Sequence, residues 1–459
     1  MLSTLCAASL LFLAGCGPGI TATSETARGS EGDSPVGDPE PGGGEDDSGL
    51  NDTGSMKEDD AAPCETDGAG LPLGAEGGFL TWDTPVSATR ATCTGGIHAV
   101  AGPAGSTLHI RLEASTESGL FVQTTDLLGQ PVADPSFLEP GDSTHVTLDR
   151  SGEFLVTLQP LHPGHVDDAP TTYTLTASCS SGCARPFTRY PVVFLHGMAG
   201  TDSYLGTLDY WYGVPETFEG AGLLGAWPAA DALASIDTRT RQWSATLDDL
   251  FAAGLGRRFN LIGHSQGGLD ARLLAHAHDP TRRVASITTV SAPHRGTVVA
   301  DLADGVLDLT PFDAWLIDAV VAGLAAFVGL SGPELSDQIR DLTTDAMETF
   351  NDDVPDRQDV VYWSWAGASC RGLDFRCQAA RGGEVIDPVF SATFRLLLLV
   401  EGDNDGIVSV ESARWGTFLG ELPADHMDEV GQIADRDHPA FDAQEFYLAE
   451  ALRLQAAGL

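Results

Sequence analysis

The stretch Phe259-Asn260-Leu261-Ile262-Gly263-His264-Ser265-Gln266-Gly267 joins a short apolar run to a G-x-S-x-G motif, and a helix-like segment at 269–278 follows it. A strand, a sharp turn and a helix in this order would lift a serine hydroxyl clear of a sheet. The flanking glycines would leave room for the strained turn. The simpler alternative is a glycine-rich turn in which Ser265 only caps the helix. The strand-like and helix-like flanks favour a nucleophilic serine.

The C-terminal part of the chain alternates between two kinds of segment. Short apolar runs, typical of strands buried on both faces, lie at 191–195, 259–262, 286–290, 360–365 and 396–400. Helical patterns lie between them, for example at 245–253. Strands that alternate with helices predict a mostly parallel α/β sheet, which we expect over 188–459.

The preceding part of the chain has a different pattern. Apolar and polar residues alternate at 107–113, 145–148, 154–158 and 173–177, and turns rich in Gly, Pro and Asp separate these runs. Short alternating strands at this spacing predict a small all-β, sandwich-like accessory domain over 63–183. In its pattern, this region resembles the pre-peptidase C-terminal type domain of exported bacterial hydrolases.

The N-terminus predicts export. Residues 1–16 form an apolar stretch that is too short for a permanent membrane span. The stretch ends in Leu13-Ala14-Gly15-Cys16, which resembles the processing site of bacterial lipoproteins, so we expect Cys16 to be lipidated. An ordinary signal peptide cleaved nearby is the alternative. The first reading places the protein in the bacterial cell envelope, at the outer membrane or cell surface, and the second predicts a secreted protein.

The chain is strongly acidic. The chain carries a formal net charge of −42 over 459 residues, which argues against nucleic acid as a partner. Residues 17–62 hold 12 acidic and 2 basic residues among many Gly, Pro and Ser. Such a segment cannot bury enough apolar area to offset its ordering entropy, so it predicts a disordered acidic linker.

Cysteines point to disulfides. Of the eight, Cys6 would leave with the signal segment and Cys16 would carry lipid, which leaves an even number. Cys370 and Cys377 are close in the sequence and form the safest predicted pair. The pairing of Cys64, Cys93, Cys179 and Cys183 stays open. A zinc site is disfavoured, because Cys179-x-x-x-Cys183 has no matching second half.

A serine nucleophile needs a base, an orienting acid and an oxyanion hole. Asp405 and His426 follow Ser265 in the order serine, acid, histidine, which is the order that α/β-hydrolases use. Asp405 and His426 are 21 positions apart. Asp403 is an alternative acid, and His438 is an alternative base.

Six collinear stretches resemble one family. They lie at 190–198, 205–215, 260–268, 291–296, 404–406 and 426–430. Together they resemble the bacterial true lipases, the Pseudomonas and Burkholderia type of triacylglycerol lipase, which have the α/β-hydrolase fold. The resemblance covers about 190–459.

The resemblance implies a role for each matched residue. Ser265 would be the nucleophile, His426 the general base and then acid, and Asp405 the residue that orients the imidazole. The backbone N–H groups of Met198 and Gln266 would form the oxyanion hole. The implied function is a serine hydrolase of lipid esters, above all triacylglycerols. The alternatives are a carboxylesterase for short soluble esters and a non-catalytic surface lipoprotein that binds ligands.

The family also implies a structural calcium ion near the catalytic histidine. Its ligands would be the carboxylates of Asp387 and Asp428 and the carbonyls of Gln432 and Arg436, since Ca²⁺ prefers oxygen. The alternative is that the two aspartates are ordinary loop acids. A helical lid is implied over about 298–333, with a fixed cap helix as the alternative. A dedicated folding chaperone, which several relatives require, is a candidate partner.

Overall fold

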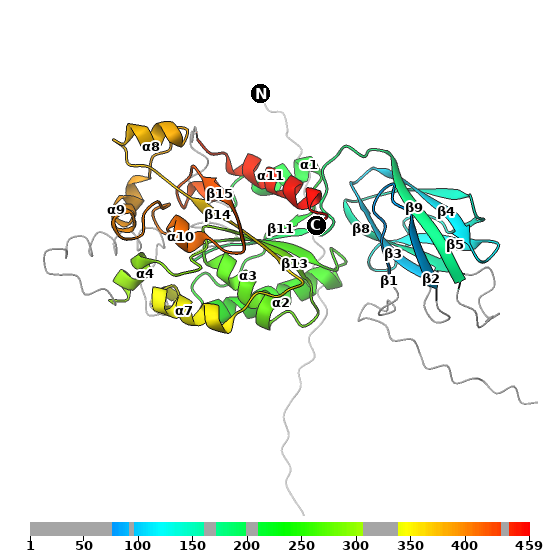
Figure 1. Ribbon diagram of the computed structural model, residues 1–459, viewed down its shortest axis with the longest axis horizontal. Helices are drawn as coiled ribbons and strands as arrows, with labels where there is room; N and C mark the ends of the chain where they lie inside the picture. The colour runs from blue at the N-terminus through cyan, green and yellow to red at the C-terminus, as the bar shows by residue number, and fades with distance from the viewer. Residues whose placement is uncertain (1–75, 91–95, 160–170, 199–209, 306–337, 433–439) are drawn as a thin grey trace, which may run out of the picture. The chain divides into compact units, whose positions relative to one another are not determined.

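The computed structural model describes residues 76–90, 96–159, 171–198, 210–305, 338–432 and 440–459 (Figure 1). All of them belong to one compact unit, Ala62–Leu459. The predicted signal segment with Cys16, the linker 17–62, and Cys64 and Cys93 lie outside the described residues. So do His438, Arg436 and the part of the predicted lid from 306 to 333.

The first part of the unit is built from two sheets. One has the order β1 (Glu76–Phe79), β3 (Gly96–Gly102), β8 (Gly152–Gln159), β5 (Leu120–Thr125) and β6 (Ser136–Leu138). The other has the order β2 (Val86–Arg90), β9 (Thr171–Ser181), β4 (Thr107–Ser115) and β7 (Ser143–Thr147). One buried cluster takes side chains from both sheets, including Val100 and Phe154 from the first and Leu108 and Leu175 from the second. The two sheets therefore share one core, which is the arrangement expected of a β-sandwich.

The second part of the unit is an α/β sheet. Its strands, in spatial order, are β11 (Gly225–Ala226), β10 (Val192–Leu195), β12 (Phe259–His264), β13 (Val284–Val290), β14 (Val361–Gly367) and β15 (Thr417–Leu422). Every neighbouring pair is parallel. Parallel strands need crossover connections, and the helices between them supply these. The sheet confirms the mostly parallel α/β class predicted from the sequence.

Helices cover both faces of this sheet (Figure 1). On one face, Val192, Phe194 and Ile262 pack against α1 (Val214–Ala221) and α11 (Ala443–Ala456). On the other face, Val193 and Leu261 pack against α2 (Ile236–Ala252) and α3 (Gln266–Ala277). The remaining helices are α4 (Val298–Ala303), α7 (Thr344–Asp353), α8 (Phe375–Ala380), α9 (Ser391–Val400) and α10 (Val410–Ala413), with 3-10 turns at Pro388–Phe390 and Asp428–Val430. No described helix combines the length and apolar character that a membrane span requires.

One predicted strand is wrong. The run 396–400 forms the second half of helix α9, and its apolar residues do not all face inward. Leu396 and Leu397 are buried, whereas Leu399 and Val400 are exposed. This one-sided burial fits a helix at the surface better than a strand buried on both faces. The edge strand beside β14 is instead β15, a segment that the apolar runs did not reveal.

The packing of α3 onto β10 yields a test. A Cβ atom at Gly267 would lie 2.2 Å from the Leu195 carbonyl oxygen. Because both groups are backbone, we expect Gly267→Ala to lower the free energy of unfolding by about 2 kcal/mol or more. Urea denaturation measures this change. Gly220→Ala is the matched control, since a Cβ atom there meets nothing within 4 Å. The control should keep or slightly raise stability, and an equal loss in both variants would contradict the packing argument.

Candidate active site

Ser265 lies at the tight turn between β12 and α3. Its backbone has φ 55° and ψ −131°, a conformation that costs energy for any residue with a side chain. The glycines on either side make the turn sterically feasible, because a Cβ atom at Gly263 would lie 2.5 Å from the Gly267 carbonyl oxygen. The turn therefore has the strained geometry that the motif predicts for a nucleophile elbow.

The structure brings the three predicted catalytic side chains together. The His426 Nε2 atom lies 3.0 Å from the Ser265 Oγ atom, and the His426 Nδ1 atom lies 2.7 Å from the Asp405 Oδ2 atom. Ser265 is 7% exposed, and the other two are almost fully buried. With Nδ1–H donating to the carboxylate, Nε2 is the atom that can accept the serine proton.

Backbone groups fix the orienting acid. The second carboxylate oxygen of Asp405 accepts hydrogen bonds from the N–H groups of Ile407 (2.8 Å) and Val408 (2.7 Å). The alternative acid, Asp403, is differently placed, because its carboxylate is 55% exposed and binds Arg381 at 2.7 Å. The geometry thus favours Asp405.

The loop after β10 passes directly over the nucleophile. A Cβ atom at Gly197 would lie 2.7 Å from the Ser265 Cβ atom, so Met198 follows a residue that touches the catalytic turn. Gln266 is the first residue of α3, where a backbone N–H has no partner within the helix. The two predicted oxyanion donors therefore lie on segments that meet at Ser265.

His196 holds this loop through both ring nitrogens. Its Nε2 atom accepts from the Ala230 N–H at 3.0 Å, and its Nδ1 atom lies 2.9 Å from the Gly197 carbonyl oxygen. Burial and the nearby Arg239 guanidinium lower the pKa of His196 to about 3. The ring stays neutral, as a buried structural histidine should.

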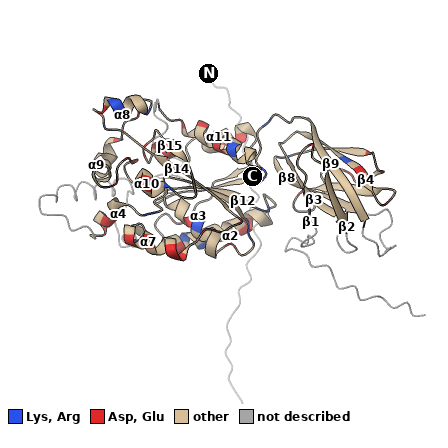
Figure 2. Cartoon of the chain, in the orientation of Figure 1, with Lys and Arg blue, Asp and Glu red and all other residues tan. Residues whose placement is uncertain are grey.

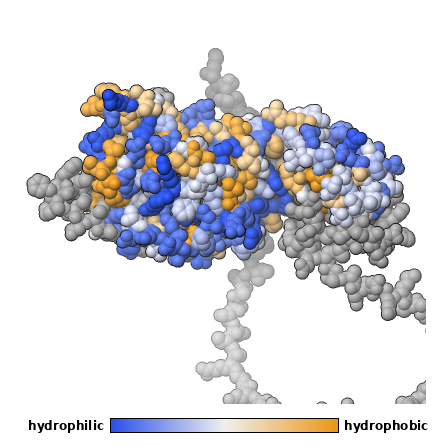
Figure 3. All heavy atoms as spheres, in the orientation of Figure 1, coloured by the Kyte–Doolittle hydropathy of each residue, from blue (hydrophilic) through white to orange (hydrophobic). Residues whose placement is uncertain are grey.

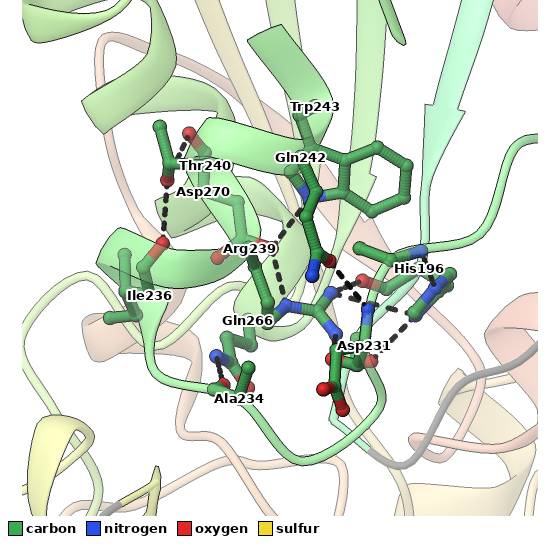
Figure 4. Close-up of polar contacts among 12 residues, drawn as sticks. His196, Asp231, Ala234, Ile236, Arg239, Thr240, Gln242, Trp243, Gln266 and Asp270 are labelled. Atoms are coloured by element: carbon green, nitrogen blue, oxygen red, sulfur yellow. Dashed lines mark hydrogen bonds and ion pairs between the residues drawn. The ribbon is translucent and has the colours of Figure 1, made fainter. Parts of the chain in front are cut away.

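A buried ion pair supports the same loop from behind (Figure 4). The Arg239 Nε atom donates to Asp270 at 2.7 Å, and both side chains are fully buried. The same guanidinium donates to the His196 carbonyl oxygen and, at 3.0 Å, to that of Asp231. Trp243 donates to Asp270 at 3.0 Å. Arg239 thereby ties α2 and α3 to the oxyanion loop.

A second hydrogen-bond chain was not predicted from the sequence. The Gly197 N–H donates to the Tyr210 hydroxyl at 2.9 Å, and that hydroxyl lies 2.7 Å from the His264 Nδ1 atom. The His264 Nε2 atom lies 2.9 Å from Glu429, and the Ser291 hydroxyl donates to the same carboxylate at 2.6 Å. The chain joins the oxyanion loop to the loop of the catalytic histidine.

Burial shifts the pKa values of the titratable groups in this hydrogen-bond chain. It lowers the pKa of His264 well below its usual value, so the ring is neutral and can accept at Nδ1 while donating at Nε2. Burial and the nearby Asp405 charge raise the pKa of Glu429 well above its usual value. The sequence signal for Glu429 was its place three residues after His426, which puts it on the turn Asp428–Val430 beside the site.

Acidic side chains gather beside the same turn. Glu384, Asp425 and Asp428 each offer a carboxylate oxygen within 4.8 Å of the others, and burial raises the pKa of Asp425 to about 6. Asp428 is the one predicted calcium ligand in this group. Asp387 donates its backbone N–H to Asp425 at 2.9 Å, and Gln432 donates its side-chain amide to the Tyr210 carbonyl oxygen at 3.2 Å.

Two disulfides lie in the described part of the chain. Cys370 pairs with Cys377, as predicted, and Cys179 pairs with Cys183. The second bond removes the free thiolates that a zinc site would need.

Three known lipases align with this chain over most of their own length. Proteins named triacylglycerol lipase from Vibrio cholerae, Burkholderia plantarii and Pseudomonas fragi are each 30% identical to it. They cover 59%, 57% and 59% of this chain, and the matches span 89%, 84% and 98% of the relatives. The chain belongs to the bacterial triacylglycerol lipase family. As a member of this family it is a carboxylic ester hydrolase, and its α/β-hydrolase fold accords with the parallel sheet.

Two further matches were found. A family model described as palmitoyl protein thioesterase matches residues 191–322. Among solved structures, the mature form of a Bacillus licheniformis lipase is 23% identical, with a TM-score of 0.42, and covers 58% of this chain and 92% of that one.

A substitution at Tyr210 tests whether the hydrogen-bond chain from Gly197 to Glu429 positions the oxyanion loop. Tyr210→Phe removes the hydroxyl that accepts from the Gly197 N–H, so the oxyanion loop should lose its alignment. We expect kcat for a soluble ester to fall about tenfold with KM nearly unchanged, because the donors act on charge that develops in the transition state. Tyr212→Phe is the control on the neighbouring residue. An unchanged kcat in Tyr210→Phe would show that this hydrogen-bond chain does not position the oxyanion loop.

Proposed function

We propose that this lipase-family member hydrolyses triacylglycerols through an acyl-enzyme formed on Ser265. The observation that carries the proposal is the placement of His426 within hydrogen-bond distance of both Ser265 and Asp405. The names of the relatives support lipid esters as the substrate class. A serine on a strained turn, with a base in contact, is the arrangement that nucleophilic ester hydrolysis requires.

In the first half of the reaction, the Ser265 Oγ atom attacks the ester carbonyl carbon while His426 Nε2 takes the hydroxyl proton. Negative charge then develops on the carbonyl oxygen, which the N–H groups of Met198 and Gln266 would stabilise. Asp405 keeps the ring oriented and stabilises the imidazolium. The protonated His426 gives its proton to the departing alcohol, and the acyl group remains on Ser265.

In the second half, a water molecule replaces the alcohol. His426 takes a proton from the water as its oxygen attacks the acyl carbon, and the same donors stabilise the oxyanion. The proton then passes from Nε2 to Ser265 as the carboxylic acid leaves. The enzyme returns to its starting state.

Ser265→Ala tests the mechanism. We expect ester hydrolysis to fall by roughly four to six orders of magnitude, and labelling by a serine-reactive phosphonate to disappear. Activity assays and mass spectrometry measure the two effects. Thr289→Ser is a control that keeps a hydroxyl on the neighbouring strand β13, and it should label normally. Equal labelling of the parent protein and Ser265→Ala would overturn the mechanism.

Assays of the parent protein on esters of increasing acyl length distinguish a triacylglycerol lipase from the two alternatives, a carboxylesterase for short soluble esters and a non-catalytic lipoprotein. A triacylglycerol lipase should hydrolyse long-chain emulsions well. Rates that decline steadily beyond short acyl groups, with no gain at an emulsion surface, would identify a carboxylesterase for soluble esters. Absence of both labelling and hydrolysis would identify a ligand-binding lipoprotein.

We also propose that the protein is exported and anchored in the bacterial cell envelope by lipid on Cys16. The support is the sequence Leu13-Ala14-Gly15-Cys16 and the acidic linker that follows it.

A structural calcium ion near the histidine loop is a further part of the proposal. The group Glu384, Asp425 and Asp428 supplies oxygen donors of the kind Ca²⁺ prefers, and three carboxylates this close repel one another unless a cation or a proton lies between them. Asp428 lies two residues after His426. The ion would hold this loop in place and would supply no step of the chemistry.

Chelation tests the calcium proposal. The melting temperature should fall by about 5 to 10 °C in EDTA relative to calcium at a hundred times its dissociation constant. Differential scanning calorimetry measures the change. Asp428→Asn should lose most of this calcium response, whereas Glu411→Gln, a control whose side chain is 67% exposed, should keep it. Identical melting of the parent protein in EDTA and in calcium would remove the ion from the proposal.

A further inference from the structure

Exposed apolar side chains concentrate in one segment that the proposed chemistry does not use. Among the described residues, the four most exposed large apolar side chains are those of Leu373 (86%), Leu399 (79%), Phe375 (73%) and Val400 (61%). Every other one is 48% exposed or less. The four belong to α8, to the loop before it and to the end of α9, and apolar surface gathers over these two helices in Figure 3. We call them the α8–α9 surface. A gathering of this kind on a soluble domain marks a contact site.

The protein holds the first half of this surface in a defined shape. The Cys370–Cys377 disulfide closes the loop that carries Leu373 and Phe375. Within it, the Asp374 carboxylate accepts from the Cys377 N–H at 3.1 Å and caps α8. The side-chain amide of Gln378 donates to the Arg371 carbonyl oxygen at 2.8 Å. Exposed apolar residues on an ordered loop can bind without a large loss of conformational entropy.

The charge around the surface is unlike that of the whole chain. The chain has 24 basic and 66 acidic residues, whereas residues 371–401, which span the whole surface, contain four arginines and four acidic residues. Arg371, Arg376 and Arg395 are exposed there, and α8 carries basic charge in Figure 2. Apolar side chains flanked by arginines are typical of segments that lie in a lipid headgroup region.

A concavity separates the two halves of the surface. It has a volume of about 580 Å³, and its lining includes Arg371, Asp374 and Arg381 on the α8 side, Phe394 and Leu398 on the α9 side, and Asp403 and Glu421 beside Arg381. Arg381 is paired there with Asp403 and Glu421, so the polar wall carries charges of both signs, and the α9 wall is apolar. This combination suits a lipid, with its headgroup toward the polar wall and its chains toward α9.

The same segment is joined to the catalytic acid. The Ser369 N–H, just before the disulfide loop, donates to the Asn404 carbonyl oxygen at 2.9 Å. Arg381 binds Asp403 at 2.7 Å, and α9 ends five residues before Asp405. A lipid surface bound here would therefore be held at the loop that carries a catalytic side chain.

We propose that the α8–α9 surface binds the enzyme to a lipid–water interface that displays anionic headgroups. Leu373, Phe375, Leu399 and Val400 enter the interface, and Arg371, Arg376 and Arg395 contact the phosphates. The inference deepens the proposed function and rests on it, because it names the physical state in which the lipid ester is met.

Vesicle binding tests the proposal. The full chain is used with Cys16→Ala throughout, so that no lipid can be attached at the predicted modification site. Cosedimentation is measured with vesicles of phosphatidylcholine, with and without phosphatidylglycerol. The double variant Leu373→Ser/Phe375→Ser should bind both kinds of vesicle roughly tenfold to a hundredfold more weakly. Arg371→Glu/Arg376→Glu should weaken binding chiefly to the anionic vesicles.

Matched controls lie elsewhere on the same domain. Leu452→Ser replaces an apolar side chain that is 47% exposed, and Arg241→Glu replaces an arginine whose side chain is 63% exposed. Both should bind vesicles like the parent protein. All variants should keep the parent melting temperature and the parent rate on a soluble short-chain ester, because none touches the catalytic groups.

The possible failures are distinct. Equal vesicle binding by the parent and by Leu373→Ser/Phe375→Ser, with ester hydrolysis intact, overturns this inference alone. Light scattering that shows a parent dimer and a variant monomer, without a change in vesicle binding, assigns the surface to a second copy of the chain and also overturns it. A parent protein that binds vesicles but hydrolyses no ester overturns the proposed function instead.

Discussion

The contact between backbone atoms at Gly267 is the constraint on which the site depends. Because this residue has no side chain, α3 approaches the end of β10, and a Cβ atom there would overlap the Leu195 carbonyl oxygen. The approach brings the first turn of α3 beside the loop that contains Met198. The strain at Ser265 is tolerated because strands and helices on both sides fix the ends of the turn.

The loop 425–430 serves three purposes within a few residues. It presents His426 to Ser265, it contributes Asp425 and Asp428 to the acidic group, and it places Glu429 against His264. Gly367 makes this possible, since a Cβ atom there would lie 1.8 Å from a Glu429 oxygen. His426 is thus positioned from both sides, by Asp405 on one side and by the buried hydrogen-bond chain through His264 and Glu429 on the other.

Local motifs carried the sequence prediction where the chemistry is local. The turn at Ser265 and the loop residues Asp405 and His426 are recognisable from their neighbours in the chain. The run 396–400 misled because leucine and valine suit both a buried strand and a one-sided helix. The family resemblance paired Ser265 with His426 across 161 positions, whereas no motif paired Glu429 with His264 or Arg239 with Asp270. Such pairs depend on which elements pack together, and periodicity does not encode that.

Net charge and local charge act at different ranges in this protein. A chain with net charge −42 is repelled by an anionic membrane at long range. At physiological ionic strength, however, charges beyond about 8 Å are largely screened. Contact is therefore decided by the side chains that touch the lipid, and around α8 and α9 these are arginine, leucine and phenylalanine. The acidic remainder of the surface would then disfavour other orientations. If the proposed surface binds lipid, repulsion elsewhere and attraction at α8 and α9 would together select a single way for the enzyme to meet a lipid surface.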